Sequence, residues 1–301
     1  MTNILITGGK GFLAGRVYEF LKKKKLKVTL SSRIKSKNFA HINWNSDKNL
    51  NRLCKDKDVI INCAGLDSHG CKLKKKAIKV NSVYPLKLLK VAKKNNVKLF
   101  IFLSTFHVYA MKSGQIFENG KLNRKSNYTL SKIKGETNVL KENSKTTKVL
   151  VLRICNLFGY PYFKNKNCWR LLINSAIKDL IEKKRFIIKS KENSYRNYSS
   201  VQSFNEFIFN IIVQLNNLKT FPKIINYCSE KNISIIEICN ILVRKIGNKK
   251  KLLFKYSNLK EVKKTIFSSK YQKHFKKLKD KYFYLELKRL IKYTKKSYNE
   301  R

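Results

Sequence analysis

A glycine-rich loop between a short apolar run and a helical pattern constrains the fold of this chain more than any other feature. Residues 4–15 read Ile-Leu-Ile-Thr-Gly-Gly-Lys-Gly-Phe-Leu-Ala-Gly and hold four of the 11 glycines among 301 residues. Gly8 and Gly11 lack side chains, so a phosphate can approach the backbone N–H groups of the loop. The N-terminus of the following helix adds a partial positive charge. The segment therefore predicts a dinucleotide whose pyrophosphate lies on Gly8, Gly11, Phe12 and Leu13.

The first half of the chain alternates apolar runs with helical patterns. Runs rich in Val, Ile, Leu and Phe predict strands near 4–7, 27–30, 41–44, 59–62, 99–104 and 149–153. Helical patterns lie near 12–25, 47–55, 72–95 and 126–143. Such alternation is typical of a parallel sheet with helices on both faces. We therefore expect an α/β fold with a Rossmann-like, doubly wound parallel sheet.

The pattern changes after Pro161. Helices are predicted near 167–183, 202–217, 234–246 and 281–293, and strands near 186–189 and 224–227. We expect residues 1–160 to form a dinucleotide-binding domain and residues 161–301 to form a smaller C-terminal α/β substrate lobe. Some segments near 186–217 are expected to return to the first domain.

The charge of the chain is extreme. It carries 68 Lys and Arg against 18 Asp and Glu, a formal net charge of +50 at pH 7. Such a charge can favour RNA or another polyanion. The lysines, however, are scattered through every segment, and the abundance of Lys, Asn, Ile, Phe and Tyr is that of an AT-rich genome. We interpret most of the charge as solvated surface and do not expect nucleic acid as the main partner.

The chain also lacks sequence signals for a membrane or an oxidising compartment. No apolar run approaches the roughly 20 residues of a membrane span, and the N-terminus reads as a strand rather than a signal peptide. The seven cysteines are odd in number and show no metal-binding spacing. They predict reduced, mostly buried thiols and no metal site. We expect a cytoplasmic protein.

Tyr128 and Lys132 form a Tyr-x-x-x-Lys pattern on one face of the helix predicted at 126–143. An ammonium beside a phenol lowers the phenol pKa from about 10, which suits a general acid or base. The pattern alone is weak, because seven of the fifteen tyrosines have Lys four residues later. The context distinguishes Tyr128 from the other tyrosines. The strand predicted at 99–104 leads to Thr105 at the sheet edge where open α/β sheets bind ligands, and the helix that carries Tyr128 follows this strand in the chain.

Several motifs between residues 3 and 245 occur in one order. They are the loop from Thr7 to Gly15, Ala64-Gly65, Asn81, Ser104-Thr105-x-x-Val-Tyr109, Tyr128 with Lys132, Leu152-Arg-Ile-Cys-Asn156, Arg196-Asn-Tyr198 and Ser234-Ile-Ile-Glu237. Together they resemble the extended short-chain dehydrogenase/reductase family, which includes NAD-dependent epimerases and dehydratases and nucleotide-sugar reductases.

The resemblance implies roles for these residues. NAD(P) would contact Gly8, Gly11, Phe12, Leu13, Arg33, Ala64, Gly65, Asn81, Tyr128 and Lys132. Thr105, Tyr128 and Lys132 would be catalytic. Tyr128 would exchange a proton with a sugar oxygen that Thr105 also binds, and Lys132 would hold the nicotinamide ribose. Thr105, His107, Asn156 and Arg196 would contact the substrate, the last two at its diphosphate.

Two departures from the family pattern refine this expectation. NAD-preferring members place an Asp after the second strand, where this chain has Ser31-Ser32-Arg33. An arginine suits a 2′-phosphate, so NADP is modestly favoured. Dehydratases carry Asp-Glu after the catalytic Thr, where this chain has Phe106-His107. A classical 4,6-dehydration is therefore not expected.

We therefore expect an NAD(P)-dependent 4-epimerase or keto-reductase of a nucleotide-activated sugar, acting in surface-polysaccharide biosynthesis. A homodimer through the helices at 72–95 and 126–143 would follow the family. The alternative is a non-catalytic dinucleotide-binding protein that binds RNA or another polyanion. The presence of Thr105, Tyr128 and Lys132 argues against that alternative, because a binding module has no need of them.

Overall fold

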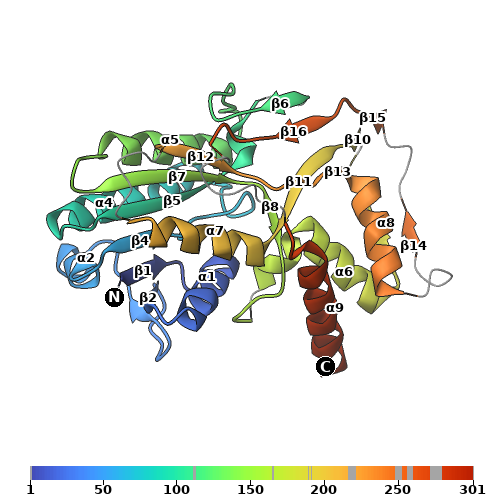
Figure 1. Cartoon of the computed structure of the whole chain (residues 1–301), viewed down its shortest axis with the longest axis horizontal. Coiled ribbons are helices and arrows are strands. Elements are labelled where there is room, and N and C mark those ends of the chain that lie inside the picture. The colour runs from blue at the N-terminus through green and yellow to red at the C-terminus, as the bar shows by residue number, and fades with distance from the viewer. Residues whose placement is uncertain are drawn as a thin grey trace.

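A seven-stranded sheet organises the molecule, with the strand order β12-β7-β5-β4-β1-β2-β3 (Figure 1). All six pairings between neighbouring strands are parallel. The strand order reverses beside β1, which lies between β4 and β2. This arrangement confirms the predicted Rossmann-like, doubly wound α/β fold. The computed structural model describes residues 2–110, 113–164, 166–188, 190, 192–215, 222–247, 253–255, 260–271 and 280–300.

The elements follow the predicted alternation. The main sheet consists of β1 (Asn3–Thr7), β2 (Lys27–Ser32), β3 (Ala40–His41), β4 (Val59–Asn62), β5 (Leu99–Thr105), β7 (Lys148–Ile154) and β12 (Ile224–Tyr227). The helices are α1 (Phe12–Lys23), α2 (Asp47–Cys54), α3 (Lys74–Ile78), α4 (Tyr84–Lys94), α5 (Asn127–Lys141), α6 (Leu172–Lys183), α7 (Val201–Val213), α8 (Ile235–Ile246) and α9 (Phe283–Asn299). The shorter strands are β6 (Gly114–Ile116), β8 (Asn156–Phe158), β9 (Arg185–Ile187), β10 (Glu192–Asn193), β11 (Tyr195–Ser200), β13 (Asn232–Ser234), β14 (Leu253–Lys255), β15 (Lys260–Glu261) and β16 (Thr265–Phe267).

One predicted strand is shorter than expected. The strand predicted at 41–44 is the two-residue β3, because Asn43 begins a turn. The Asn43 side chain accepts a hydrogen bond from the Asn45 N–H, and Ser46 then caps α2 through the Asn49 N–H. Local side-chain hydrogen bonds of this kind compete with a strand ladder.

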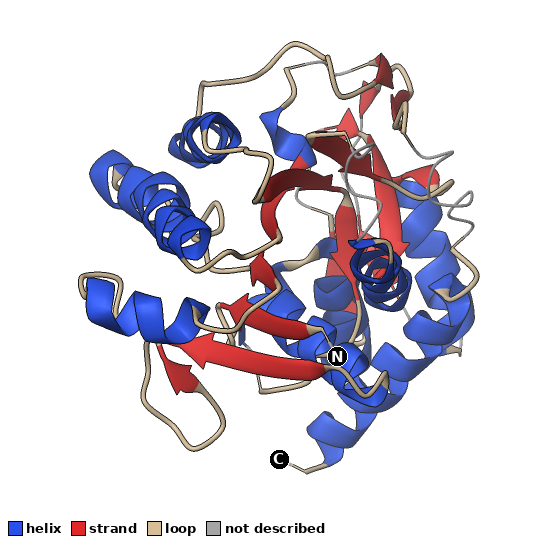
Figure 2. Ribbon diagram, turned by 60° about the vertical axis from the view of Figure 1, so that its left-hand side comes forward, coloured by secondary structure: helices blue, strands red, loops and turns tan. Residues whose placement is uncertain are grey.

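Helices cover both faces of the sheet, as Figure 2 shows. Successive residues of β1 point to opposite faces: Ile4 and Ile6 pack in the core with α1 and α7, whereas Leu5 packs in the core with α2, α4 and α5. Because both faces of a strand are buried, its sequence reads as a continuous apolar run. This explains why the apolar runs of the first half predicted the sheet.

A π-helical turn, Lys79–Val83, joins α3 to α4 within the region predicted as one helix at 72–95. Pro85 has no N–H to donate to the carbonyl of Asn81, four residues earlier. The Asn81 carbonyl instead faces Gly135 of α5, where an added Cβ would lie 2.3 Å from it. Gly135 therefore allows α5 to pack closely against this turn.

The segment after Pro161 adds a third core. In this core α6, α8 and α9 pack together through residues such as Ile177, Leu242 and Leu287, all fully buried. These helices lie beside the sheet at the right of Figure 1. Two elements of this half nevertheless join the first: β12 pairs with β7, and α7 packs against α1.

Asp280 ties the last part of the chain to the start of α7. Its carboxylate accepts hydrogen bonds from the Ser200 N–H at 2.6 Å, from Ser200 Oγ at 2.7 Å, from Ser203 Oγ at 2.6 Å and from Ser199 Oγ at 3.1 Å. Asp280 is 6% exposed. A carboxylate at a helix N-terminus also meets the positive end of the helix dipole.

Most of the cysteines are buried, as predicted. All seven are free, and all except the partly exposed Cys63 are buried. The described part of the chain contains no group of His, Cys, Asp and Glu side chains that could hold a metal ion. Within that part, every helix is too short or too polar to cross a membrane.

Candidate active site

The loop between β1 and α1 has a conformation that requires glycine. Gly8 has a φ of +77°, and an added Cβ would lie 2.9 Å from the backbone N of Ala64 at the end of β4. The Gly11 N–H donates to the Gly8 carbonyl at 2.7 Å, and the Gly9 N–H donates to the Ser31 carbonyl at 2.8 Å. The loop is thus held between the ends of β2 and β4, with its backbone exposed on the other side.

The start of α1 is suited to an anion. Gly11 is the N-cap, and among the described residues no side chain caps the helix. The first turn also contains no acidic residue. The first N–H groups of a helix have no partner within the helix, and the helix dipole makes them electropositive. Phe12 and Leu13 therefore present backbone donors where the sequence predicts a pyrophosphate.

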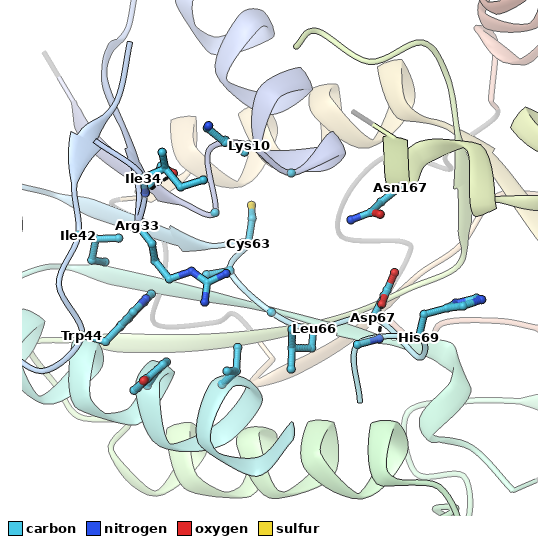
Figure 3. A pocket seen from close by; sticks show the side chains of 18 of the residues that line it. Lys10, Arg33, Ile34, Ile42, Trp44, Cys63, Leu66, Asp67, His69 and Asn167 are labelled. Carbon is cyan, nitrogen blue, oxygen red and sulfur yellow. Dashed lines mark hydrogen bonds between the residues drawn. The ribbon is translucent and has the colours of Figure 1, made fainter. Parts of the chain in front are cut away.

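A cavity of about 700 Å³ lies in front of this loop (Figure 3). Five of the ten predicted cofactor residues line it: Gly8, Gly11, Arg33, Ala64 and Gly65. The Arg33 side chain points into the cavity from the end of β2. The other five, Phe12, Leu13, Asn81, Tyr128 and Lys132, are not among its lining residues.

One wall of this cavity contains an aromatic pair that sequence analysis missed. The rings of Trp44 and Tyr84 are stacked, with centroids 5.1 Å apart and planes 5° apart. Both residues line the cavity together with Ile42 and Arg33. One signal was available: Trp44 is one of two tryptophans in the chain, and it stands at the end of the strand predicted near 41–44.

Asn81 and Lys132 lie directly behind the floor of the cavity. An added Cβ on Gly65 would lie 3.1 Å from Asn81 Oδ1 and 3.2 Å from Lys132 Nζ. Asn81 Oδ1 accepts from the Leu66 N–H at 2.7 Å, and its Nδ2 donates to Ser131 Oγ at 3.0 Å. Asn81 therefore fixes the segment after β4 against α5, while the Lys132 ammonium lies beneath Gly65.

A second cavity, of about 250 Å³, holds the predicted substrate residues. His107, Tyr128, Asn156 and Arg196 all line it, although they come from four separate segments of the chain. Thr105 is buried beside them, with an exposed fraction of 5%. The structure thus brings these five residues together.

The two cavities meet at shared residues. Asp67, His69, Asn167 and Arg170 line both of them. Arg170 Nη1 lies 3.3 Å from Asp67 Oδ2, so an exposed ion pair links the segment after β4 to the segment before α6. Because the two cavities share these residues, a ligand in one cavity can contact a ligand in the other. None of the four shared residues was predicted from the sequence.

The hydrogen bonds of Thr105 orient the phenol of Tyr128. Thr105 Oγ1 accepts from the His107 N–H at 3.3 Å, because Thr105 caps the short 3₁₀ turn Phe106–Val108. The Thr105 side chain also hydrogen-bonds Tyr128 and lowers the phenol pKa. A donor that stabilises the phenolate has this effect. The Thr105 hydroxyl thus lies beside the phenol oxygen of Tyr128 and favours its ionised form.

The predicted effect of Lys132 on Tyr128 is wrong in this structure. Burial is the largest cause acting on the phenol and raises the pKa of Tyr128 to about 12. Lys132 is not among the groups that shift it. The Lys132 ammonium donates instead to the Leu103 carbonyl at 2.9 Å. Tyr128 is consequently a protonated phenol near pH 7, which is the form of a general acid.

His107 lies close to Tyr128, and burial shifts the pKa values of the two side chains in opposite directions. The two ring centroids are 6.4 Å apart. Desolvation within the site, and secondarily the positive charge of Arg196, lower the pKa of His107. The imidazole is therefore neutral near pH 7 and can accept as well as donate a hydrogen bond.

Gly8→Ala is expected to weaken dinucleotide binding at least tenfold and to reduce the free energy of unfolding by about 1 to 3 kcal/mol. A methyl group at this position must move Ala64 or the loop. Isothermal titration with NAD⁺ and NADP⁺, together with urea unfolding, measures both effects. Gly247→Ala is the matched control, because Gly247 has a φ of +88° and no atom within 4 Å of an added Cβ among the described residues. Equal dinucleotide affinity in the two variants would contradict the assignment of the loop.

Comparisons with known proteins agree with this geometry. The sequence model of the NAD dependent epimerase/dehydratase family matches residues 4–226. No curated protein matches the chain by sequence. Among solved structures, MoeE5 in complex with UDP-glucose and NAD is similar, with a TM-score of 0.82 and 16% identity over 98% of this chain and 99% of the other. The UDP-glucose 4-epimerase of Thermotoga maritima has a TM-score of 0.78 and 20% identity over 98% and 99%. The UDP-glucuronic acid 4-epimerase of Bacillus cereus has a TM-score of 0.78 and 20% identity over 99% and 100%.

Proposed function

Because the chain belongs to the NAD dependent epimerase/dehydratase family, we propose that it is an NAD(P)-dependent enzyme that acts on a nucleotide-activated sugar. The reaction is a 4-epimerisation or the reduction of a keto-sugar, in the biosynthesis of a surface polysaccharide. One observation carries the proposal: the cavity of about 700 Å³ on the glycine loop shares lining residues with a second cavity that Tyr128 lines.

The residues of the first cavity fit the cofactor. The Gly8 and Gly11 backbone and the start of α1 would hold its pyrophosphate, while Trp44 and Tyr84 would lie beside its adenosine. Lys132, beneath Gly65, would hold its nicotinamide ribose. When bound, this group supplies hydride transfer at a sugar carbon.

Tyr128 would act as the acid and base at the sugar oxygen. Tyr128 lines the second cavity, so its hydroxyl can reach the oxygen of a ligand bound there. A protonated phenol can donate its proton to a carbonyl oxygen as an alcohol forms, and the phenolate accepts a proton in the reverse direction. Thr105 stabilises that phenolate.

The second cavity would bind the sugar nucleotide. Asn156 and Arg196 line it, and an arginine suits a diphosphate because its guanidinium can donate two parallel hydrogen bonds. The titles of the similar structures name UDP-sugars, which supports a nucleoside diphosphate sugar for this chain as well. We propose the segment after residue 160 as the substrate lobe, because it contributes Arg170 and Arg196 to this cavity.

Arg33 supports a preference for NADP over NAD. It points into the first cavity near Trp44, and it makes no ion pair among the described residues (Figure 3). Arg33→Ala is expected to weaken NADP⁺ binding about tenfold, because a guanidinium–phosphate contact is lost, while NAD⁺ binding changes less than threefold. Titration of both dinucleotides checks this. Lys35→Ala is the control, because Lys35 is exposed and does not line the cavity. Equal losses for NADP⁺ and NAD⁺ would argue against a 2′-phosphate contact.

A panel of nucleotide sugars, each incubated with NAD⁺ or NADPH, tests the proposed function. Absorbance at the reduced cofactor band and the mass of the products are followed together. Stoichiometric consumption of NADPH identifies a reductase, whereas an isomeric product without net cofactor change identifies an epimerase. Absence of turnover with every sugar, combined with RNA binding that persists in moderate salt, would favour the non-catalytic alternative.

A further inference from the structure

A buried ion pair lies beneath the proposed catalytic residues. Arg153 of β7 and Glu136 of α5 are each 3% exposed. Arg153 Nη2 donates to Glu136 Oε2 at 2.6 Å, and Arg153 Nε donates to both carboxylate oxygens, at 3.1 and 3.2 Å. Removal of two charges from water is costly, so such a pair is not by itself evidence for stability. The pair lies next to the residues that hold Tyr128 and Lys132, which suggests that it has a role in the site.

Glu136 also binds the end of β5. Its Oε1 accepts the hydroxyl of Ser104, which stands between two residues that hold α5. The carbonyl of Leu103, on one side, accepts the Lys132 ammonium at 2.9 Å. Thr105, on the other side, hydrogen-bonds Tyr128. Three consecutive residues of β5 thus each hold a side chain of α5.

The other side of Arg153 fixes the pair in place. Its Nη1 donates to Tyr109 Oη at 2.8 Å and to the Glu118 carbonyl at 2.9 Å. Tyr109 Oη in turn donates to Asn226 Oδ1 at 2.6 Å. These hydrogen bonds fix the orientation of the Arg153 guanidinium. Its hydrogen bonds to Glu136 then fix the orientation of the carboxylate.

We propose that Glu136 is a positioning residue, whose carboxylate sets α5 against the end of β5 and so places Tyr128 and Lys132 relative to Thr105. Glu136 touches neither cavity and acts through Ser104 and through the helix that it shares with Lys132. This inference rests on the proposed function for its catalytic meaning, but its geometry does not depend on it.

The carboxylate also acts on the charge of Lys132. Burial is the largest cause and lowers the pKa of Lys132 to about 8, whereas Cys71, Glu136 and Cys63 raise it. Loss of the Glu136 charge therefore lowers the Lys132 pKa further. The ammonium would then lose its proton at a lower pH, and its hydrogen bond to a ribose would weaken from that pH upward.

Glu136→Gln tests the proposal, with Glu286→Gln as the matched control. Glu286 pairs with Arg16 at 3.2 Å, and both side chains are 1% exposed, so its loss disturbs a comparable buried pair away from both cavities. NAD⁺ binding is followed from pH 6 to 10 through tryptophan fluorescence, since Trp44 lines the cavity. We expect the alkaline midpoint of binding to fall to a lower pH in Glu136→Gln and to stay in place in Glu286→Gln.

A second readout needs neither cofactor nor substrate. The rate at which acetic anhydride modifies Lys132, measured by peptide mass spectrometry against pH, reports its protonation in the free protein. The same downward shift is expected in Glu136→Gln. Identical midpoints in the two variants, in both readouts, would reduce Glu136 to a merely structural residue. If the wild-type protein turns over no sugar, the proposed function fails while these two titrations still decide the role of Glu136.

Discussion

Tyr128→Phe is expected to lower the turnover of the enzyme about a thousandfold. The substitution removes one hydroxyl, which the structure places beside Thr105 in the second cavity. Affinity for NAD⁺ and NADP⁺ should stay within about twofold, because Tyr128 does not line the first cavity. Steady-state kinetics with the sugar found in the panel, and titration with both dinucleotides, measure the two effects.

Tyr18→Phe is the matched control for this prediction. Tyr18 also has a lysine four residues later, Lys22, but it lies on α1 and lines neither cavity. Its loss should leave turnover unchanged, so the contrast separates the site from the bare spacing. Retention of most of the turnover by Tyr128→Phe would remove Tyr128 from the mechanism.

Asp280→Ala is expected to reduce the free energy of unfolding by about 3 to 5 kcal/mol. The carboxylate accepts four hydrogen bonds from Ser199, Ser200 and Ser203, and its removal leaves buried donors without their acceptor. The start of α7 also loses a negative charge at the positive end of its dipole. Urea unfolding followed by far-UV circular dichroism gives the difference.

Asp179→Ala provides the comparison. Asp179 is partly exposed and forms an ion pair with the exposed Lys183 along α6, and surface pairs of this kind contribute less than about 1 kcal/mol. The two variants remove the same side chain from a buried network and from a surface pair. Similar losses of stability in both would contradict the role assigned to Asp280.

The sequence predicted the main sheet because its strands are apolar on both faces. The runs at 59–62 and 99–104 lie within β4 and β5, whose residues are all buried. In contrast, β11 reads Tyr-Arg-Asn-Tyr-Ser-Ser and was not predicted. Its buried polar residues find partners far away in the sequence: Asn197 bonds Ser229, and Ser200 bonds Asp280. No local sequence pattern predicts hydrogen bonds between residues so far apart in the chain.

The sequence predicted those residues of the candidate site that belong to a family motif. Family motifs indicated Tyr128, Asn156 and Arg196, and the structure brings all three to one cavity. Residues that meet only through tertiary contacts were missed, as the ion pair between Asp67 and Arg170 illustrates. The phenol pKa was predicted in the wrong direction, because spacing on a helix shows where Lys132 lies but not how deeply Tyr128 is buried.

The hydrogen bonds of Asp280 also bear on the order in which the protein folds during synthesis. A ribosome makes β1, α1, β4 and β5 early, and these elements can pair as they emerge. The first turn of α7, however, depends on the carboxylate of Asp280, which lies 80 residues after Ser200 in the chain. Until that acceptor leaves the ribosome, α7 lacks one of the partners that hold it in place over α1. The first turn of α7 is therefore secured only after Asp280 has been synthesised, long after the strands that α7 covers.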